Sequence, residues 1–239
     1  MTIRRAVIWG ASGGIGGALV DALVASGNFA TVYAGSRTPI APAATVRPFA
    51  FDLTDEASIA DAADGIGADG PVDLTIVATG LLHGGDHRPE KGIAALTPEA
   101  MLALYRINTV GPAMIAKHMV AALPRDRRSV FAALSARVGS IGDNRLGGWH
   151  SYRASKAALN MVIANLAIEL RRTRPQAIVL GLHPGTVATD LSAPFQKGVA
   201  PDRLFTADVS AHHLLSVIDG AREGDSGSVL AWDGQRIVP

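Results

Sequence analysis

A glycine-rich turn follows the first predicted strand of this chain and leads directly into a predicted helix. The strand covers residues 6–9, the turn reads Gly10-Ala11-Ser12-Gly13-Gly14-Ile15-Gly16, and the helix covers residues 15–26. Glycines allow a tight turn, and the N–H groups at a helix N-terminus attract an anion such as pyrophosphate. A glycine cluster alone also occurs in plain tight turns, but its place after the first strand predicts nucleotide binding. The predicted contacts are Gly10, Ser12, Gly13, Gly14, Ile15 and Gly16.

Short apolar or β-branched runs alternate with helical patterns along the chain. The runs lie at residues 6–9, 31–34, 46–51, 72–78, 130–134, 177–182 and 228–231, and longer helical patterns cover 98–123 and about 151–171. Such alternation is typical of a parallel sheet with helices on both faces. A chain of 239 residues suits one α/β domain. We predict a doubly wound parallel sheet of about seven strands over residues 1–239, with substrate loops at about 140–151 and 190–205.

Composition excludes several classes of protein. Lys and Arg number 22 against 21 Asp and Glu, and no basic cluster combines with aromatic residues as a nucleic-acid surface would require. Cysteine is absent, which rules out disulfides and leaves a cytoplasmic location as the default expectation. The longest uncharged helical run, 157–168, is shorter than the ~20 residues of a membrane span. Residues 1–10 lead straight into the glycine turn, so no signal peptide is expected.

The second predicted strand ends in Ser36 and Arg37, at the place where an Asp or Glu would hold the ribose of NAD. A hydroxyl and a guanidinium there favour a 2′-phosphate, so we predict NADP(H) in preference to NAD(H). A solvated surface arginine is the alternative interpretation. Asp52 ends the third predicted strand, where it could accept from an adenine amino group or cap the helix that starts near Thr54.

Tyr152 and Lys156 lie four residues apart in the helix predicted from residue 151. At that spacing the two side chains share one helix face. A nearby ammonium lowers the pKa of a tyrosine, as a general acid or base requires. Such a pair alone is usually a surface contact, but in a chain that begins with the glycine turn it indicates catalysis. Beyond Lys156 the helix is apolar nearly all round, which predicts a homodimer or homotetramer formed through this helix.

Together these motifs resemble the short-chain dehydrogenase/reductase family over essentially the whole chain. The glycine turn, the Tyr152 and Lys156 pair, and Pro184-Gly185-Thr186-Val187-Ala188-Thr189 occur in the family's order and at its distances. Pro89-Glu90-Lys91, Leu182-His183-Pro184-Gly185 and Ala231-Trp232-Asp233-Gly234 are similar to its C-factor/sniffer-like carbonyl reductase branch. The resemblance implies a Rossmann-type fold.

The resemblance also implies roles for individual residues. Tyr152 would donate or accept the proton, Lys156 would hold the nicotinamide ribose, and Asn108 would hold a water that links Lys156 to solvent. Besides the glycine turn, Tyr152 and Lys156, the implied cofactor contacts are Ser36, Arg37, Asp52, Leu53, Ala78, Thr79, Gly80, Pro184, Gly185, Val187 and Thr189.

Two positions depart from the family pattern. The family's Asn-Asn-Ala-Gly reads Val77-Ala78-Thr79-Gly80, which removes the asparagine bonds that brace that strand. The serine that polarises the substrate carbonyl falls on Ala136. Ser135 and Ser140 are the nearby substitutes; we name Ser135 as the catalytic candidate, although adjacent strand residues face opposite sides.

The other singled-out residues have plainer interpretations. His83, His87, His212 and His213 lack the clustered carboxylates of metal sites, so no metal is expected. His150 is interpreted as a solvated loop residue, with a pocket role as the alternative. Loop residues expected at the pocket mouth would make it apolar, namely Trp149, Leu191, Pro194 and Phe195.

The sequence therefore predicts an NADP(H)-dependent enzyme that interconverts a small-molecule carbonyl compound and a secondary alcohol. The cofactor carries the hydride, and the protein supplies orientation and proton transfer. The alternative is a non-catalytic or weakly catalytic nucleotide-bound signalling protein of the same fold.

Overall fold

The computed structural model describes residues 3–38, 40–84 and 88–239 of the chain. Over these residues an eight-stranded sheet has the strand order β3-β2-β1-β4-β5-β6-β9-β10. Neighbouring strands are parallel except for β9 and β10, which pair antiparallel. The strands are β1 (Arg5–Trp9), β2 (Thr31–Ser36), β3 (Val46–Ala50), β4 (Leu74–Val77), β5 (Ser129–Leu134), β6 (Ala177–His183), β9 (Ser228–Ala231) and β10 (Arg236–Ile237).

The predicted α/β architecture is confirmed, and each predicted strand run overlaps an observed strand. The eighth strand, β10, was not expected. A second small sheet pairs β7 (Thr186–Val187) with β8 (Leu204–Phe205). Strands of two residues are too short to leave a periodic pattern in the sequence.

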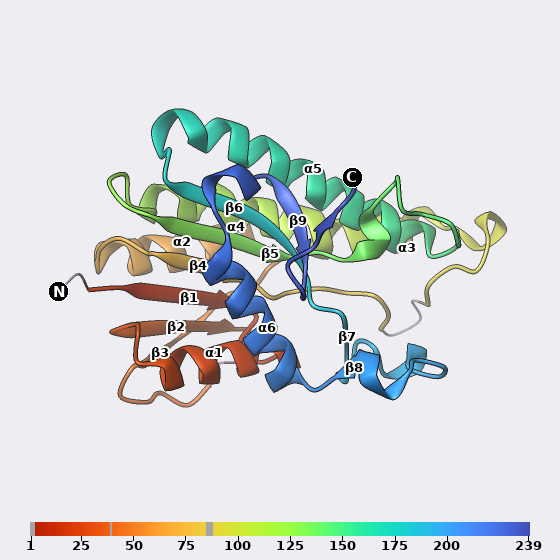
Figure 1. Ribbon diagram of the computed structural model, residues 1–239, viewed down its shortest axis with the longest axis horizontal. Coiled ribbons are helices and arrows are strands. Elements are labelled where there is room, and N and C mark those ends of the chain that lie inside the picture. The colour runs from red at the N-terminus through yellow and green to blue at the C-terminus, as the bar shows by residue number, and fades with distance from the viewer. Residues whose placement is uncertain (1–2, 39, 85–87) are drawn as a thin grey trace.

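Helices cover both faces of the sheet (Figure 1). On one face α1 (Gly14–Ser26) packs against α6 (Ala207–Gly220), and on the other lie α2 (Glu56–Ala68), α4 (Gly111–Met119) and α5 (His150–Thr173). Alternate residues of one strand enter different cores: Ile8 packs on the α1/α6 side and Val7 on the opposite side. Because both faces are covered, strands such as β5 are buried throughout and show no period of two.

The helix predicted over 98–123 is interrupted. It consists of α3 (Pro98–Tyr105), a π-helical turn (Arg106–Val110) and α4, followed by a short 3-10 turn. Pro112 supplies no backbone N–H, which favours a change of hydrogen-bond pattern just before it. The π-helical turn contains Asn108 and buries it completely. Such turns are frequent at functional sites.

The strand order reverses between β1 and β4, since β2 lies on one side of β1 and β4 on the other. At such a reversal the loops from the two strands separate and leave a crevice at their carboxyl ends. The chain after β6 continues into β7 and β8 at this end of the sheet (Figure 1). Within the described residues no helix has the length and hydropathy of a membrane-crossing segment.

Candidate active site

The glycine turn after β1 has no room for side chains at its closest positions. A Cβ at Gly16 would lie 2.1 Å from the carbonyl oxygen of Gly10, and one at Gly14 would lie 2.8 Å from Cγ2 of Thr189. Gly10 has a φ of 101°, which disfavours residues with side chains. Gly13 caps α1 without a side-chain hydrogen bond, and the first turn of α1 contains no acidic residue. The helix therefore presents its N-terminal N–H groups to an anion.

A cleft of about 700 Å³ lies beside this turn. Its walls come from the turn, from the ends of β4, β5 and β6, and from α5. The predicted residues that line it are Ser12, Gly13, Gly14, Ile15, Arg37, Ala78, Thr79, Gly80, Ser135, Tyr152, Lys156, Pro184 and Thr189. The predicted residues outside its lining are Gly10, Gly16, Ser36, Asp52, Leu53, Asn108, Gly185 and Val187. Gly10 and Gly16 shape the turn from behind, and the side chain of Leu53 packs on Gly111.

At the end of β2 the two residues expected at a 2′-phosphate behave differently. Arg37 is exposed and lines the cleft, whereas Ser36 is buried and its hydroxyl donates to the carbonyl oxygen of Thr38 at 2.5 Å. The Ser36 hydroxyl proton is thus already used within the protein. Asp52 is exposed and accepts from the backbone N–H and hydroxyl of Thr54 at 2.8 Å each. It does not cap α2, because Asp55 does so through the N–H of Ala57.

Tyr152 and Lys156 lie on the first two turns of α5 and are both buried. The Lys156 ammonium donates to the carbonyl oxygen of Leu134 at 2.8 Å and lies 5.9 Å from the centre of the Tyr152 ring. Around Gly80 the two sides of the cleft meet: a Cβ there would lie 3.7 Å from Oδ1 of Asn108 and 3.9 Å from Nζ of Lys156. The helix spacing thus brings a phenol and an ammonium to one wall of the cleft.

Burial controls the protonation of this pair. It raises the pKa of Tyr152 to about 12 and lowers the pKa of Lys156 to about 7. The helix spacing predicted that Lys156 would lower the pKa of Tyr152; desolvation instead dominates in the structure, because each buried group disfavours its charged form. At neutral pH Tyr152 therefore keeps its proton and can donate it.

Asn108 ties the π-helical turn to the segment after β4. Its Oδ1 accepts from the N–H of Leu81 at 2.8 Å, and its Nδ2 donates to the carbonyl oxygen of Leu81 at 2.8 Å and to Ser155 Oγ at 3.1 Å. Ser155 belongs to α5, next to Lys156. Asn108 therefore joins two walls of the cleft, and its role in holding a water stays a prediction.

A family model described as short chain dehydrogenase matches residues 4–200. The chain belongs to the short-chain dehydrogenases/reductases. C-signal of Myxococcus xanthus is 34% identical over 138 residues, which are 57% of this chain and 77% of that protein. An uncharacterised oxidoreductase of Schizosaccharomyces pombe is 27% identical over 253 aligned residues, covering 97% of this chain and 96% of the relative.

Among solved structures, an NADPH-bound carbonyl reductase from chicken fatty liver is 26% identical and superposes with a TM-score of 0.86 over 100% of both chains. The carbonyl reductase Sniffer of D. melanogaster has the same fold, with a TM-score of 0.85 at 21% identity over 100% of both chains. The matches to C-signal and to carbonyl reductases support the C-factor/sniffer-like branch.

The residues present fit the dinucleotide that short-chain dehydrogenases use. The turn at Gly14 and Gly16 is a cradle that side chains would fill. Within the described part of the chain the buried hydroxyl of Thr79 has no hydrogen-bond partner, and Thr79 lines the cleft. A bound ribose or phosphate would satisfy such a group, which is costly to leave unpaired.

The position of the missing short-chain dehydrogenase serine is clear in the structure. Ala136 packs with Tyr152, Leu82 and Leu104, so it faces the substrate side. The hydroxyl of Ser135 donates to Oδ1 of Asn160 on α5 at 2.5 Å. Ser140 accepts from the N–H of Asp143 at 2.9 Å and lines neither this cleft nor the adjoining cavity. Ser135 lines both the cleft and the adjoining cavity, so the geometry disfavours Ser140 only, and the catalytic role of Ser135 stays a prediction.

A smaller cavity of about 220 Å³ adjoins Tyr152. The ring centres of Trp149 and Phe195 lie 4.9 Å apart, and those of Trp149 and Tyr152 lie 6.2 Å apart. Of the loop residues expected at the pocket mouth, Trp149, Leu191 and Phe195 line this cavity, whereas Pro194 does not. His150 lines neither cavity and begins α5. The cavity is a candidate substrate site with mostly apolar walls.

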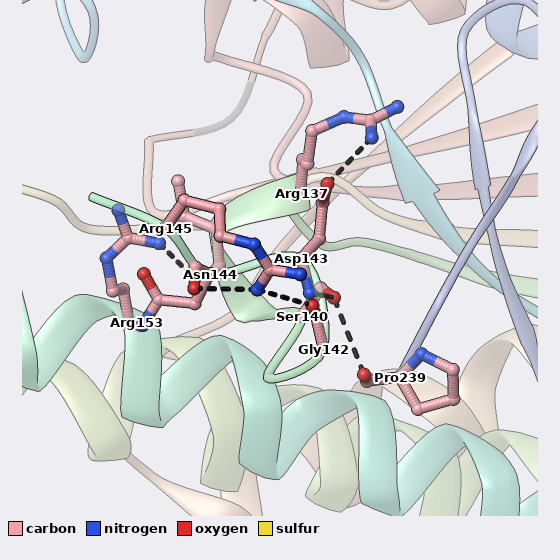
Figure 2. Close-up of polar contacts among 9 residues, drawn as sticks. Arg137, Ser140, Gly142, Asp143, Asn144, Arg145, Arg153 and Pro239 are labelled. Carbon is pink, nitrogen blue, oxygen red and sulfur yellow. Dashed lines mark hydrogen bonds and ion pairs between the residues drawn. The ribbon is translucent and has the colours of Figure 1, made fainter. Parts of the chain in front are cut away.

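The loop between β5 and α5 is held by polar contacts within the loop and by contacts to Arg153 and Pro239 (Figure 2). Arg137 pairs with Asp143 at 2.8 Å, and Arg145 donates to the carbonyl oxygen of Gly142 at 2.9 Å. The N–H of Gly142 donates to the carbonyl oxygen of Pro239 at 2.8 Å. From α5, Arg153 donates to the carbonyl oxygen of Gly148 at 3.0 Å. These contacts fix the approach of the chain to Trp149.

Sequence reasoning missed two contributors to this site. His83 contacts the carbonyl oxygens of Asp190 and Leu191 at 3.2 and 3.1 Å and so joins the segment after β4 to the substrate loop. Glu90 bonds to the start of α5; its place in the Pro89-Glu90-Lys91 segment was the one available signal. No group of three or more potential metal-ligating side chains occurs in residues 3–38, 40–84 and 88–239. His87 lies outside these described residues.

Proposed function

We propose that this protein is an NADPH-dependent reductase of a carbonyl compound, which in the reverse direction oxidises a secondary alcohol. The observation that carries the proposal is that Tyr152 and Lys156 line the same cleft as the glycine turn. Tyr152 also lines the smaller cavity, so its phenol stands at the boundary between the two spaces. That is where a general acid must lie to reach a carbonyl oxygen.

When bound, NADPH supplies the hydride that reduces the carbonyl carbon. Tyr152, protonated at neutral pH, donates its proton to the oxygen. Lys156 would hold the nicotinamide ribose, with Leu134 fixing the position of its ammonium. Asn108, Pro184, Gly185, Val187 and Thr189 are proposed to complete the site, as the family resemblance implies. The aromatic and aliphatic side chains around Trp149 would exclude water and favour a substrate of appreciable apolar area.

The preference for NADP(H) over NAD(H) is supported by Arg37, which is exposed at the cleft wall directly after β2. A guanidinium binds a phosphate with charge-assisted hydrogen bonds. The carbonyl reductase from chicken fatty liver, 26% identical, was crystallised with NADPH. We expect a smaller contribution from Ser36, because its hydroxyl donates to the carbonyl oxygen of Thr38.

We further propose that α5 pairs with a second copy of the chain in a homodimer or homotetramer. Met161 and Ile168 of this helix are 62% and 55% exposed. Apolar side chains on a helix surface are stabilised when a partner covers them. The two residues lie seven apart, two turns of the same face.

A second candidate function is favoured by Ala136, which has a methyl group at the position where the family has its carbonyl-polarising serine. The chain would then be a nucleotide-bound signalling protein with weak or absent catalysis, and C-signal is among its relatives. Consumption of NADPH with a panel of aldehydes, ketones and quinones separates the two. Turnover that depends on Tyr152 supports the reductase, whereas NADPH binding without turnover of any member supports the signalling protein.

A further inference from the structure

Helix α5 begins without a cap from its own sequence. Its N-cap residue is Trp149, which adopts a left-handed conformation with φ 50° and ψ 41° and makes no side-chain cap hydrogen bond. By contrast, α2, α3 and α6 are capped by Asp55, Thr97 and Thr206. The helix that carries Tyr152 therefore needs another acceptor for its first N–H groups.

Glu90 supplies this acceptor from 61 residues away. Its Oε2 accepts from the N–H of Ser151 at 3.2 Å, and its Oε1 accepts from the hydroxyl of Ser151. The backbone oxygen of Glu90 accepts from the N–H of Trp149 at 2.5 Å. Glu90 thus bonds to the N-cap residue Trp149 and to Ser151, the residue immediately before Tyr152.

The surroundings stabilise the ionised carboxylate of Glu90. The residue is 5% exposed, and Ser151 is fully buried. Burial acts to raise the pKa of Glu90, but the hydrogen bonds from Ser151 and from the backbone of Glu90, together with His150 nearby, outweigh it and hold the pKa below its usual value. The positive end of the α5 dipole also favours a negative charge at this place. A buried carboxylate with both oxygens on one serine is a specific anchor.

We propose that Glu90 is a positioning residue for catalysis: by capping α5 it directs Tyr152 and Trp149 into the substrate cavity. Ser151 precedes Tyr152 directly, so a loosened first turn would displace the phenol. The contact to the N–H of Trp149 holds the strained backbone that turns the indole towards Phe195 and Tyr152. The catalytic part of this inference rests on the proposed reductase function, whereas the capping part does not.

Glu90→Ala and Glu90→Gln test the proposal, with Glu99→Ala as the matched control. Glu99 also lies in the first turn of a helix, α3, but is exposed. Because small displacements of a reacting group are costly, Glu90→Ala should lower kcat about 10- to 100-fold. Its Kd for NADPH should stay within about twofold, because the glycine turn is untouched. Glu90→Gln keeps an acceptor for the Ser151 N–H, so it should restore most of kcat. Glu99→Ala should match the wild type.

Hydrogen exchange of backbone amides tests the capping of α5 independently of enzyme activity. Glu90→Ala should speed exchange of the Ser151 and Tyr152 amides and leave the amides of β2 unchanged. Unaltered exchange at these two amides overturns the capping role. A wild type that reduces no carbonyl defeats the proposed function, yet the exchange result still decides the cap.

The positioning role is overturned if Glu90→Ala lowers thermal stability while kcat is unchanged, or if Glu90→Gln is as slow as Glu90→Ala. Should Glu90→Ala fail to fold, Glu90→Asp takes its place, because the shorter side chain withdraws the carboxylate from the Ser151 N–H while keeping its charge. It must lower kcat with NADPH affinity unchanged; an unchanged kcat again refutes the role.

Discussion

The ammonium of Lys156 lies 2.8 Å from the carbonyl oxygen of Leu134 and 5.9 Å from the centre of the Tyr152 ring. The end of β5 therefore fixes the lysine, while helix spacing fixes its distance from the phenol. Both groups are buried, and burial favours the neutral form of each. Without a bound cofactor, Tyr152 is therefore protonated at neutral pH, as a proton donor in the reduction of a carbonyl must be.

Tyr152→Phe should bind NADPH as the wild type does and lose ~10²–10⁴-fold in turnover, because the change deletes the acid and keeps the ring. Steady-state NADPH consumption measures the loss, and fluorescence titration measures binding. Tyr105→Phe, on α3, is the control and should keep full activity. Equal rates for Tyr152→Phe and wild type would show that another group donates the proton.

Stability in the absence of cofactor should depend on pH through Lys156. Its pKa is about 7 in the folded protein against 10.5 normally, so between these values the unfolded chain binds the extra proton. The free energy of unfolding therefore rises with pH from about 7 to about 10. Tyr152 acts in the opposite direction above pH 10, because its folded pKa is about 12. Urea unfolding of Lys156→Met should show a smaller rise over the first interval than wild type. An identical rise in both proteins contradicts the assignment.

Arg37→Ala should weaken NADPH binding about 10- to 100-fold, since one charge-assisted contact is worth ~1.5–3 kcal/mol. NADH binding should change little, because NADH lacks the 2′-phosphate. Arg47→Ala is the control: Arg47 is exposed and pairs with Asp69. Calorimetric titration of both cofactors provides the comparison. Equal wild-type affinities for NADPH and NADH would refute the role of Arg37.

Ala136→Ser should raise reductase activity, by at most the ~10²–10³-fold that one preorganised donor is worth. Ala136 already faces Tyr152, so the added hydroxyl needs no backbone change. Ser135→Ala should leave kcat near the wild-type value and cost about 0.5–1.5 kcal/mol of stability, because it removes the bond to Asn160. If Ser135→Ala abolishes turnover, Ser135 is the carbonyl-binding serine after all.

Local sterics and periodicity made much of this protein predictable. Gly10 and Gly16 marked the turn because side chains at these positions meet backbone at once, and this is visible from glycine spacing after a strand. The strands could be read from continuous apolar runs, since both faces of the sheet are covered. Tyr152 and Lys156 shared a wall because i and i+4 share a helix face, whatever else surrounds them.

Contacts between residues far apart in the sequence, and the pKa values that burial sets, were decided by the tertiary structure. Only the fold brings Glu90 to Ser151 and the hydroxyl of Ser135 to Oδ1 of Asn160. It likewise set the pKa values of Tyr152 and Lys156, because desolvation depends on what covers a group and not on its neighbours in sequence. The sequence determined which groups are available and on which element they lie. Packing determined which way each points and what charge it carries.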